Sequence, residues 1–192
     1  MACLNLFVYG TLMSGFRSNQ FIPKNATMEK GMITGNLFHY IVGYPIVQIP
    51  EKKDQVIGCK NCMKDIEQQD KHNWSEPINL EFDINFGRVY GELYKIPFET
   101  KEELTEILNK LDGYEGFDPS APSNLYLRSL VPVKTADHIT WAWVYNMKEL
   151  PVSTVLIRTG NWRDCFYTKS NTIRPEVDAA IPDLITREYD WV

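Results

Sequence analysis

The clearest helix signal in the chain ends at an acidic residue held between two glycines. Four aliphatic side chains recur at the spacing of one helical face: Leu104, Ile107, Leu108 and Leu111. Thr100 and Glu103 match a capping box, which predicts that the helix begins there. Gly113 is expected to end it, because glycine adopts the left-handed conformation at low cost. Glu115 would then lie on a turn beyond the helix, before Gly116, either as a solvated loop residue or with its carboxylate directed into a cavity.

Short apolar or alternating segments on both sides of this helix predict strands. They are residues 4–8, 31–40, 43–49, 87–96, 125–133 and 139–145. The last two are separated by a short turn at 135–137, so we expect them to pair as a hairpin. Several strands with few helices favour an α+β fold built on a small barrel or a strongly curved sheet.

The length of 192 residues favours a single domain spanning 1–192. Residues 50–86 differ from the rest, because they are rich in Lys, Asp, Glu, Gln and Asn and poor in aliphatic side chains. We therefore expect them to form a polar insertion that leaves the core. The segment from Thr186 is consistent either with a helix or with an arm packed on the surface.

The charge pattern argues against several classes of partner. The formal net charge is -5, and no block of like charges is present, so neither nucleic acid nor a membrane surface is the expected partner. No apolar run approaches the length of a membrane span, and the first residues lack the pattern of a signal peptide. The four cysteines do not resemble a disulfide framework, so a reducing, cytoplasmic location is expected.

Two other motifs invite a chemical interpretation. Cys59 and Cys62 form a single CxxC that, with His72, supplies only part of a zinc site, because a closed site needs four ligands. We expect no metal there. Asp112 lies three residues before Glu115 and suggests a paired-carboxylate site, but a helix-end residue that hydrogen-bonds to nearby backbone is the favoured interpretation. The sequence shows no Ser/His/Asp or Cys/His set.

A glycine turn follows the first predicted strand. Tyr9, Gly10, Thr11 and Leu12 come directly after the apolar run, and turns of this kind can present backbone N–H groups to an anionic ligand. Most such turns only reverse the chain, so this motif is weak when taken alone.

Taken together in their order, these motifs resemble those of the γ-glutamylcyclotransferase-like family, in its AIG2-like and γ-glutamylamine cyclotransferase branch. The similar segments are 8–12 (VYGTL), 43–45 (GYP), 89–94 (VYGELY), 111–116 (LDGYEG), 126–128 (YLR), 143–145 (WVY) and 160–163 (GNWR). Each segment is common, and their joint order is what makes the resemblance specific. It leaves out residues 50–86 and the C-terminal tail.

The resemblance implies a small mixed β-barrel with a few helices and a cofactor-independent enzyme of acyltransferase or lyase type. Such an enzyme cyclises a γ-glutamyl amine or peptide to 5-oxoproline and releases the free amine. The resemblance implies that Glu115 is the general acid/base, that residues 9–12 (Tyr9, Gly10, Thr11, Leu12) hold the glutamyl head through backbone groups, and that Tyr126 lines the pocket. Arg128 is either a substrate contact or, as we favour, an ion-pair partner beneath the site.

A non-catalytic small-molecule binding module on the same barrel is the alternative function. An acid at position 115 favours the enzyme, because a binder has little use for it there. The sequence leaves the leaving amine and the oligomeric state open.

Overall fold

The computed structural model describes residues 2–74 and 85–166. The strands are β1 (Ala2–Val8), β2 (Thr27–Tyr40), β3 (Tyr44–Gln48), β4 (Gly87–Phe98), β5 (Leu127–Lys134), β6 (Ile139–Asn146) and β7 (Thr154–Leu156). The helices are α1 (Cys62–Trp74) and α2 (Lys101–Glu115), and two short 3-10 helices are η1 (Arg17–Phe21) and η2 (Trp162–Cys165). All six predicted strands are present, and β5 and β6 form the expected hairpin.

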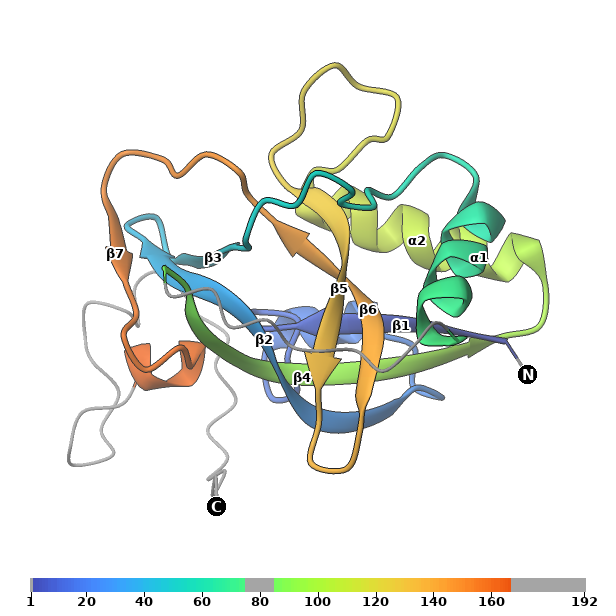
Figure 1. Cartoon of the computed structure of the whole chain (residues 1–192), viewed down its shortest axis with the longest axis horizontal. Coiled ribbons are helices and arrows are strands. Elements are labelled where there is room, and N and C mark those ends of the chain that lie inside the picture. Colours follow the sequence, from blue (N-terminus) through green and yellow to red (C-terminus); the bar gives the residue numbers. More distant parts are fainter. Residues whose placement is uncertain (1, 75–84, 167–192) are drawn as a thin grey trace.

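Five strands close into a small barrel in the order β2-β4-β1-β6-β5, because β5 pairs back onto β2 at Met32 and Lys134 (Figure 1). The pairing of β1 with β6 is parallel, and the other pairings are antiparallel, so the barrel is mixed. The far end of the long strand β2 leaves the barrel and pairs with β3 and β7. The predicted α+β class with a small mixed barrel is therefore confirmed.

Helix α2 covers one end of the barrel and buries the aliphatic face that the sequence predicts. The side chain of Thr100 accepts a hydrogen bond from the Glu103 N–H, as expected for the cap. The predicted end of the helix is wrong, because Gly113 is an exposed position inside the helix. The left-handed residue is Gly116 (φ 67°), and its N–H donates to the Asp112 carbonyl. Glu115 is thus the last helical residue and not part of a following turn.

Residues 62–74, within the predicted polar insertion, form helix α1 and pack on the barrel beside α2, which corrects the expectation that this part leaves the core. The side chains of Asp65 and Gln69 are buried. The Gln69 side chain accepts from the Asn5 N–H (2.8 Å) and donates to the Cys3 carbonyl (2.9 Å), so it satisfies backbone groups of β1. Composition alone predicts an exposed position for Asp65 and Gln69. They are buried because their polar atoms hydrogen-bond to buried partners in the protein.

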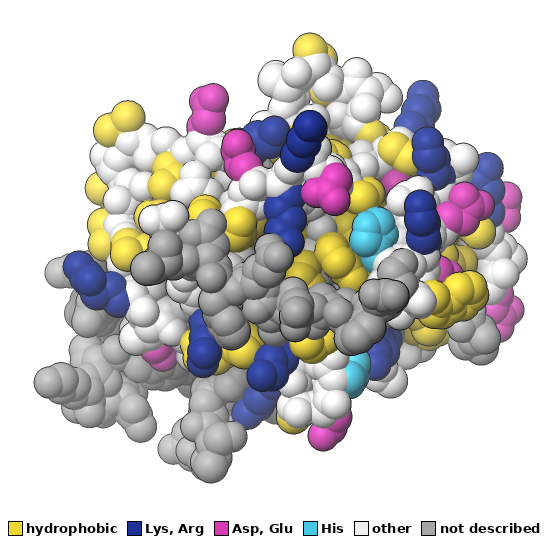
Figure 2. All heavy atoms as spheres, in the orientation of Figure 1, with side chains coloured by type: hydrophobic (Ala, Val, Ile, Leu, Met, Phe, Trp, Pro, Cys, Tyr) yellow, Lys and Arg dark blue, Asp and Glu magenta, His cyan; other side chains and the backbone are white. Residues whose placement is uncertain are grey.

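The surface carries charges of both signs, and Figure 2 shows Lys and Arg side chains interspersed with Asp and Glu on one face. Within residues 2–74 and 85–166, no helix combines the length and the apolar character that crossing a bilayer requires. The segment from Thr186, for which the sequence suggests a helix or an arm, lies outside the described residues.

Candidate functional site

The glycine turn after β1 packs directly against the start of β3. The Met13 N–H donates to the Gly10 carbonyl (2.9 Å), which closes the turn. A Cβ added at Gly10 would lie 2.2 Å from Cγ of Pro45, so only glycine fits this close approach. Two segments that are far apart in the sequence, 8–12 and 43–45, therefore meet and form one wall of a cavity.

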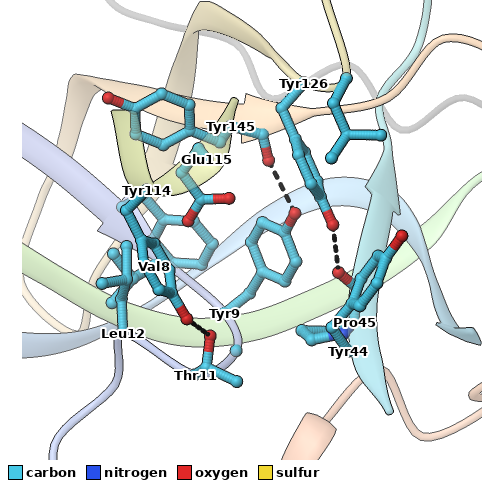
Figure 3. Close-up of a pocket in the computed structure, with 13 residues that line it drawn as sticks. Val8, Tyr9, Thr11, Leu12, Tyr44, Pro45, Tyr114, Glu115, Tyr126 and Tyr145 are labelled. Atoms are coloured by element: carbon cyan, nitrogen blue, oxygen red, sulfur yellow. Dashed lines mark hydrogen bonds between the residues drawn. The ribbon is translucent and has the colours of Figure 1, made fainter. Parts of the chain in front are cut away.

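The cavity has a volume of about 230 Å³ and lies between this turn, β3, the end of α2 and the segment that enters β5. Tyrosine is the most frequent side chain in its wall (Figure 3). The lining residues are Phe7, Val8, Tyr9, Gly10, Thr11, Leu12, Tyr44, Pro45, Tyr114, Glu115, Leu125, Tyr126 and Tyr145. They include every predicted site residue, so the structure brings the candidate catalytic and binding positions together.

Glu115 supplies the only carboxyl group among these lining residues. It is half-buried at the end of α2, and Figure 3 shows its carboxylate directed into the space between the tyrosine rings. Within the described part of the chain, no side chain donates a hydrogen bond to it. Burial raises the pKa of Glu115 to about 8, and the nearby negative charge of Asp112 acts in the same direction. The site therefore holds a carboxyl group that can gain or lose a proton near neutral pH.

The hydroxyl groups of Tyr9 and Tyr126 make hydrogen bonds to backbone groups of the protein. Tyr9 donates to the carbonyl of Tyr145 (2.7 Å) and accepts from the Val47 N–H (3.3 Å), which joins β6 to β3. Tyr126 donates to the carbonyl of Pro45 (2.8 Å). Both phenols are buried, and burial raises the pKa of each above its ordinary value. Their rings form walls of the cavity and stay neutral across the physiological pH range.

Tyr114 connects the last turn of α2 to the glycine turn, and the sequence analysis missed it. Its hydroxyl lies 2.9 Å from Oγ1 of Thr11 and donates to Oγ of Ser18 (2.8 Å). Its ring also packs on Phe21, with 4.8 Å between the centroids. Its position directly before Glu115 at the helix end could have indicated a place in the site. Only the fold shows that Thr11 lies beside Tyr114.

Arg128 lies behind the cavity and does not line it. Its side chain is 1% exposed and binds two carboxylates, Asp112 at 2.8 Å and Asp65 at 2.6 Å. Of the two roles that the resemblance allows, the structure shows the ion-pair partner. The interpretation of Asp112 as a helix-end residue that hydrogen-bonds to nearby backbone holds for its carbonyl, which accepts from the N–H groups of Gly116 and Phe117. It does not account for the carboxylate, which binds Arg128 and also accepts from the Tyr145 hydroxyl (2.6 Å).

Another buried carboxylate, Glu92, lies at the far side of the glycine turn, and the sequence analysis did not identify it. It is 2% exposed and accepts from both the N–H and the hydroxyl of Ser14, each at 2.6 Å. Tyr94 and Arg163 also donate to it, at 2.9 and 3.0 Å. The sequence did contain a clue, because Glu92 lies between Tyr90 and Tyr94 on one face of the predicted strand 87–96. The segment at 160–163 thus reaches the turn through Arg163.

The CxxC motif lies at the start of α1 and outside the cavity. Cys59 and Cys62 are both free thiols, and Sγ of Cys62 lies 3.3 Å from Oγ1 of Thr105. Among the described residues, no group of three or more His, Cys, Asp or Glu side chains is arranged to hold a metal ion.

The solved structures to which this chain is similar include the following three. YkqA of Bacillus subtilis is 20% identical with a TM-score of 0.49, over 84% of this chain and 40% of that one, so the chain spans less than half of YkqA. The uncharacterized protein PH0828 of Pyrococcus horikoshii is 17% identical (TM-score 0.45), over 84% and 91% of the two chains. An AIG2-like protein of Mus musculus is 18% identical (TM-score 0.46), over 80% and 83%. A search of curated protein sequences gives no match.

A comparison with models of protein families gives a match over most of the chain. A family model described as γ-glutamyl cyclotransferase, AIG2-like, matches residues 6–71 and 77–164. The match includes most of residues 50–86, which corrects the expectation that this part lies outside the family pattern. It also includes every residue that lines the cavity. The chain therefore belongs to the AIG2-like γ-glutamyl cyclotransferase family.

Proposed function

We propose that this protein is an enzyme that cyclises a γ-glutamyl amine or peptide to 5-oxoproline and releases the free amine. The observation that carries the proposal is Glu115, a half-buried carboxyl group that faces a cavity beside a glycine turn and has a pKa raised to about 8. In this proposal Glu115 is the general acid/base.

The reaction needs one proton acceptor that later becomes a donor. The substrate's α-ammonium group gives a proton to the Glu115 carboxylate, and the freed amine attacks the γ-carbonyl carbon. A C–N bond forms, the tetrahedral intermediate collapses, and the bond to the leaving amine breaks as Glu115 returns the proton to that nitrogen. The ring nitrogen loses its second proton to solvent as it becomes a neutral amide, and the released amine, which is far more basic than an amide, takes up a proton from solvent in turn. A positioned acid/base contributes about 10²–10⁴ in rate. A pKa raised by burial suits this role, because the carboxylate becomes a stronger base.

The entering substrate also adjusts the protonation of Glu115. A positive α-ammonium group close to the carboxyl favours its ionised form, which opposes the effect of burial. Burial, which raises the pKa of Glu115 to about 8, brings its proton affinity closer to that of an α-amine and so lowers the cost of the transfer. Holding the substrate in the ring-closing conformation adds a proximity term.

The glycine turn is suited to bind the glutamyl head. Within the described part of the chain, the N–H groups of Gly10, Thr11 and Leu12 donate to no backbone or side-chain acceptor. These residues line the cavity, so their N–H groups are candidates for the substrate carboxylate or for the oxyanion that develops on the γ-carbonyl oxygen. Tyr126 and Tyr9 contribute ring surface and not hydroxyl groups.

A non-catalytic binding module on the same barrel is the second candidate. It would use the same cavity and turn but has no need for a titrating carboxyl group. The raised pKa of Glu115 therefore favours the enzyme.

The test is a screen of γ-glutamyl amides, γ-glutamyl dipeptides and glutathione for release of 5-oxoproline, with the parent protein and Glu115→Gln side by side. We expect turnover of at least one compound by the parent and a loss of about 10² or more in Glu115→Gln, with ligand binding retained. Glu106→Gln is the matched control, because Glu106 is an exposed glutamate on the same helix. Binding without turnover by the parent would favour the binding module.

A further inference from the structure

A chain of buried polar side chains runs from helix α1 to the back of the candidate site. Asp65 on α1 binds Arg128 on β5, Arg128 binds Asp112 on α2, and Asp112 binds the Tyr145 hydroxyl on β6. The Tyr145 carbonyl accepts from the Tyr9 hydroxyl, so the same residue also reaches the start of the glycine turn. This series of hydrogen-bonded side chains therefore reaches the cavity at two places, Tyr145 and the last turn of α2.

Asp112 occupies the decisive place in this chain, because it lies three residues before Glu115 on the same face of the helix. Its carbonyl accepts from the N–H groups of Gly116 and Phe117, which closes the helix just after Glu115. Its carboxylate is held by Arg128 at 2.8 and 2.9 Å and by Tyr145 at 2.6 Å. Backbone and side chain of one residue thus fix the end of the helix that carries Glu115.

Arg128 itself has little freedom to move. It stacks over Phe117 and Trp143, with 5.3 and 5.6 Å to the ring centroids. A Cβ at Gly58 would lie 2.4 Å from its Nε, so the backbone of the segment before α1 packs against the guanidinium group. The cation can therefore not follow Glu115 when that residue ionises.

The charge balance behind the cavity is negative. One buried cation, Arg128, faces the two carboxyl groups of Asp65 and Asp112, and burial raises the pKa of each. When both are ionised, the cluster carries one net negative charge before Glu115 ionises. The other groups that face Glu115 are phenols: Tyr9 from the glycine turn, Tyr44 from β3, Tyr114 from α2, Tyr126 before β5 and Tyr145 from β6. Burial raises the pKa of four of them, namely Tyr9, Tyr44, Tyr126 and Tyr145. These four phenols stay neutral, and Asp112 is the charged group that acts on Glu115.

We infer that Asp112, clamped by Arg128 and Tyr145, is a positioning residue that fixes Glu115 at the cavity and places a negative charge beside its carboxyl group. The inference deepens the proposed function and rests on it for the role of Glu115 as acid/base. It assigns a use to helix α1, because Asp65 supplies the outer carboxylate that holds Arg128 in place.

The test follows the protonation of Glu115 directly, by ¹³C NMR of labelled glutamate side chains, with the Glu115 signal assigned from its absence in Glu115→Gln. In Asp112→Asn the side chain keeps its size and acceptor oxygen but loses its charge, so we expect the midpoint of Glu115 to fall by about one pH unit or more. Asp65→Asn is the matched control. It also removes one carboxylate charge that pairs with Arg128, but Asp65 lies on α1 and not on the helix that carries Glu115. Its effect should be less than half as large.

An unchanged Glu115 midpoint in Asp112→Asn, or equal shifts in the two variants, would overturn the inference. If Asp112→Asn does not fold, the Asp112 signal of the parent protein, labelled on its aspartate side chains, gives the same test. It should show a second inflection at the midpoint of Glu115 that disappears in Glu115→Gln, and a single inflection would count against the inference.

Activity gives an independent readout. The acid limb of the kcat/KM profile should move to lower pH in Asp112→Asn, whereas a merely structural role would lower the plateau without moving the limb. Tyr145→Phe keeps the charge of Asp112 and should leave the limb in place. The NMR titration needs no substrate, so an absence of 5-oxoproline release would reject the proposed function without deciding the titration result.

Discussion

The carboxylate of Glu92 and the guanidinium group of Arg163 lie 3.0 Å apart, with side chains only 3% and 7% exposed. The pair joins β4 to η2, and both residues also bind Ser14: Glu92 accepts from its N–H and hydroxyl, and Arg163 donates to its carbonyl (2.7 Å). A segment from the far end of the described chain therefore holds the glycine turn from behind.

Replacing Arg163 by methionine should leave the Glu92 carboxylate buried without its cation. Breaking a buried pair in this way typically costs about 3–5 kcal/mol, and we expect a loss of that order in the free energy of unfolding, measured by urea denaturation. Lys95→Met is the control, because Lys95 pairs with Glu29 at 2.9 Å but with side chains 40% and 32% exposed. That change should cost about 1 kcal/mol or less. Equal losses in the two variants would contradict a buried, structural role for Arg163.

Two glycines near the site should respond to alanine in opposite directions. In Gly10→Ala the new Cβ would lie 2.2 Å from the Pro45 ring, so the turn or β3 must shift, and we expect lower stability and weaker ligand binding. Gly113 is an exposed helical position where a Cβ meets nothing within 4 Å, so Gly113→Ala should stabilise the protein by about 0.5–1 kcal/mol. Thermal unfolding of both variants decides this, and destabilisation by Gly113→Ala would mean that the helix ends earlier than residue 115.

The barrel was predictable because its strands and α2 bury apolar side chains at regular spacing. Leu104 and Leu111 on α2 lie in the core, as their helical periodicity indicates. Closure of the barrel was not deducible from spacing, because it depends on one pairing between Met32 and Lys134, which lie far apart in the sequence.

The polar residues were harder to interpret than the apolar ones. Asp65 and Gln69 look like surface residues by composition, yet they are buried because Arg128 and the backbone of β1 supply their partners. Glu115 was identified from its motif, but the helix that carries it runs to residue 115 because the left-handed cap is Gly116 and not Gly113. Where two glycines lie close together near a helix end, the spacing of residues in the sequence does not decide which one ends the helix.

Glu115 should also make the stability of the protein depend on pH. Its pKa is raised from 4.5 in the unfolded chain to about 8 in the folded protein, so the folded state binds the proton more tightly. The contribution that the protonated Glu115 makes to the free energy of unfolding is fully present below pH 4.5, and it is lost as the pH rises through 8. Glu115→Gln removes this loss, so the variant should be more stable than the parent at pH 9, by on the order of a few kcal/mol. Denaturation curves at pH 5 and pH 9 test this, with Glu106→Gln as the control, and equal pH dependence in parent and Glu115→Gln would show that the pKa of Glu115 is not raised.

The type of reaction is decided by which atom attacks the γ-carbonyl. In the proposed function the substrate's own α-amine attacks, so a substrate acetylated on that nitrogen should bind but not turn over. Water does not enter the product, because one nitrogen replaces another at a carbon that keeps its oxygen. Mass spectrometry of a reaction run in oxygen-18 water should therefore find unlabelled 5-oxoproline. Labelled free glutamate would mean instead that Glu115 activates water, in which case the protein is an amidohydrolase that uses the same cavity and the same carboxyl group for a different attack.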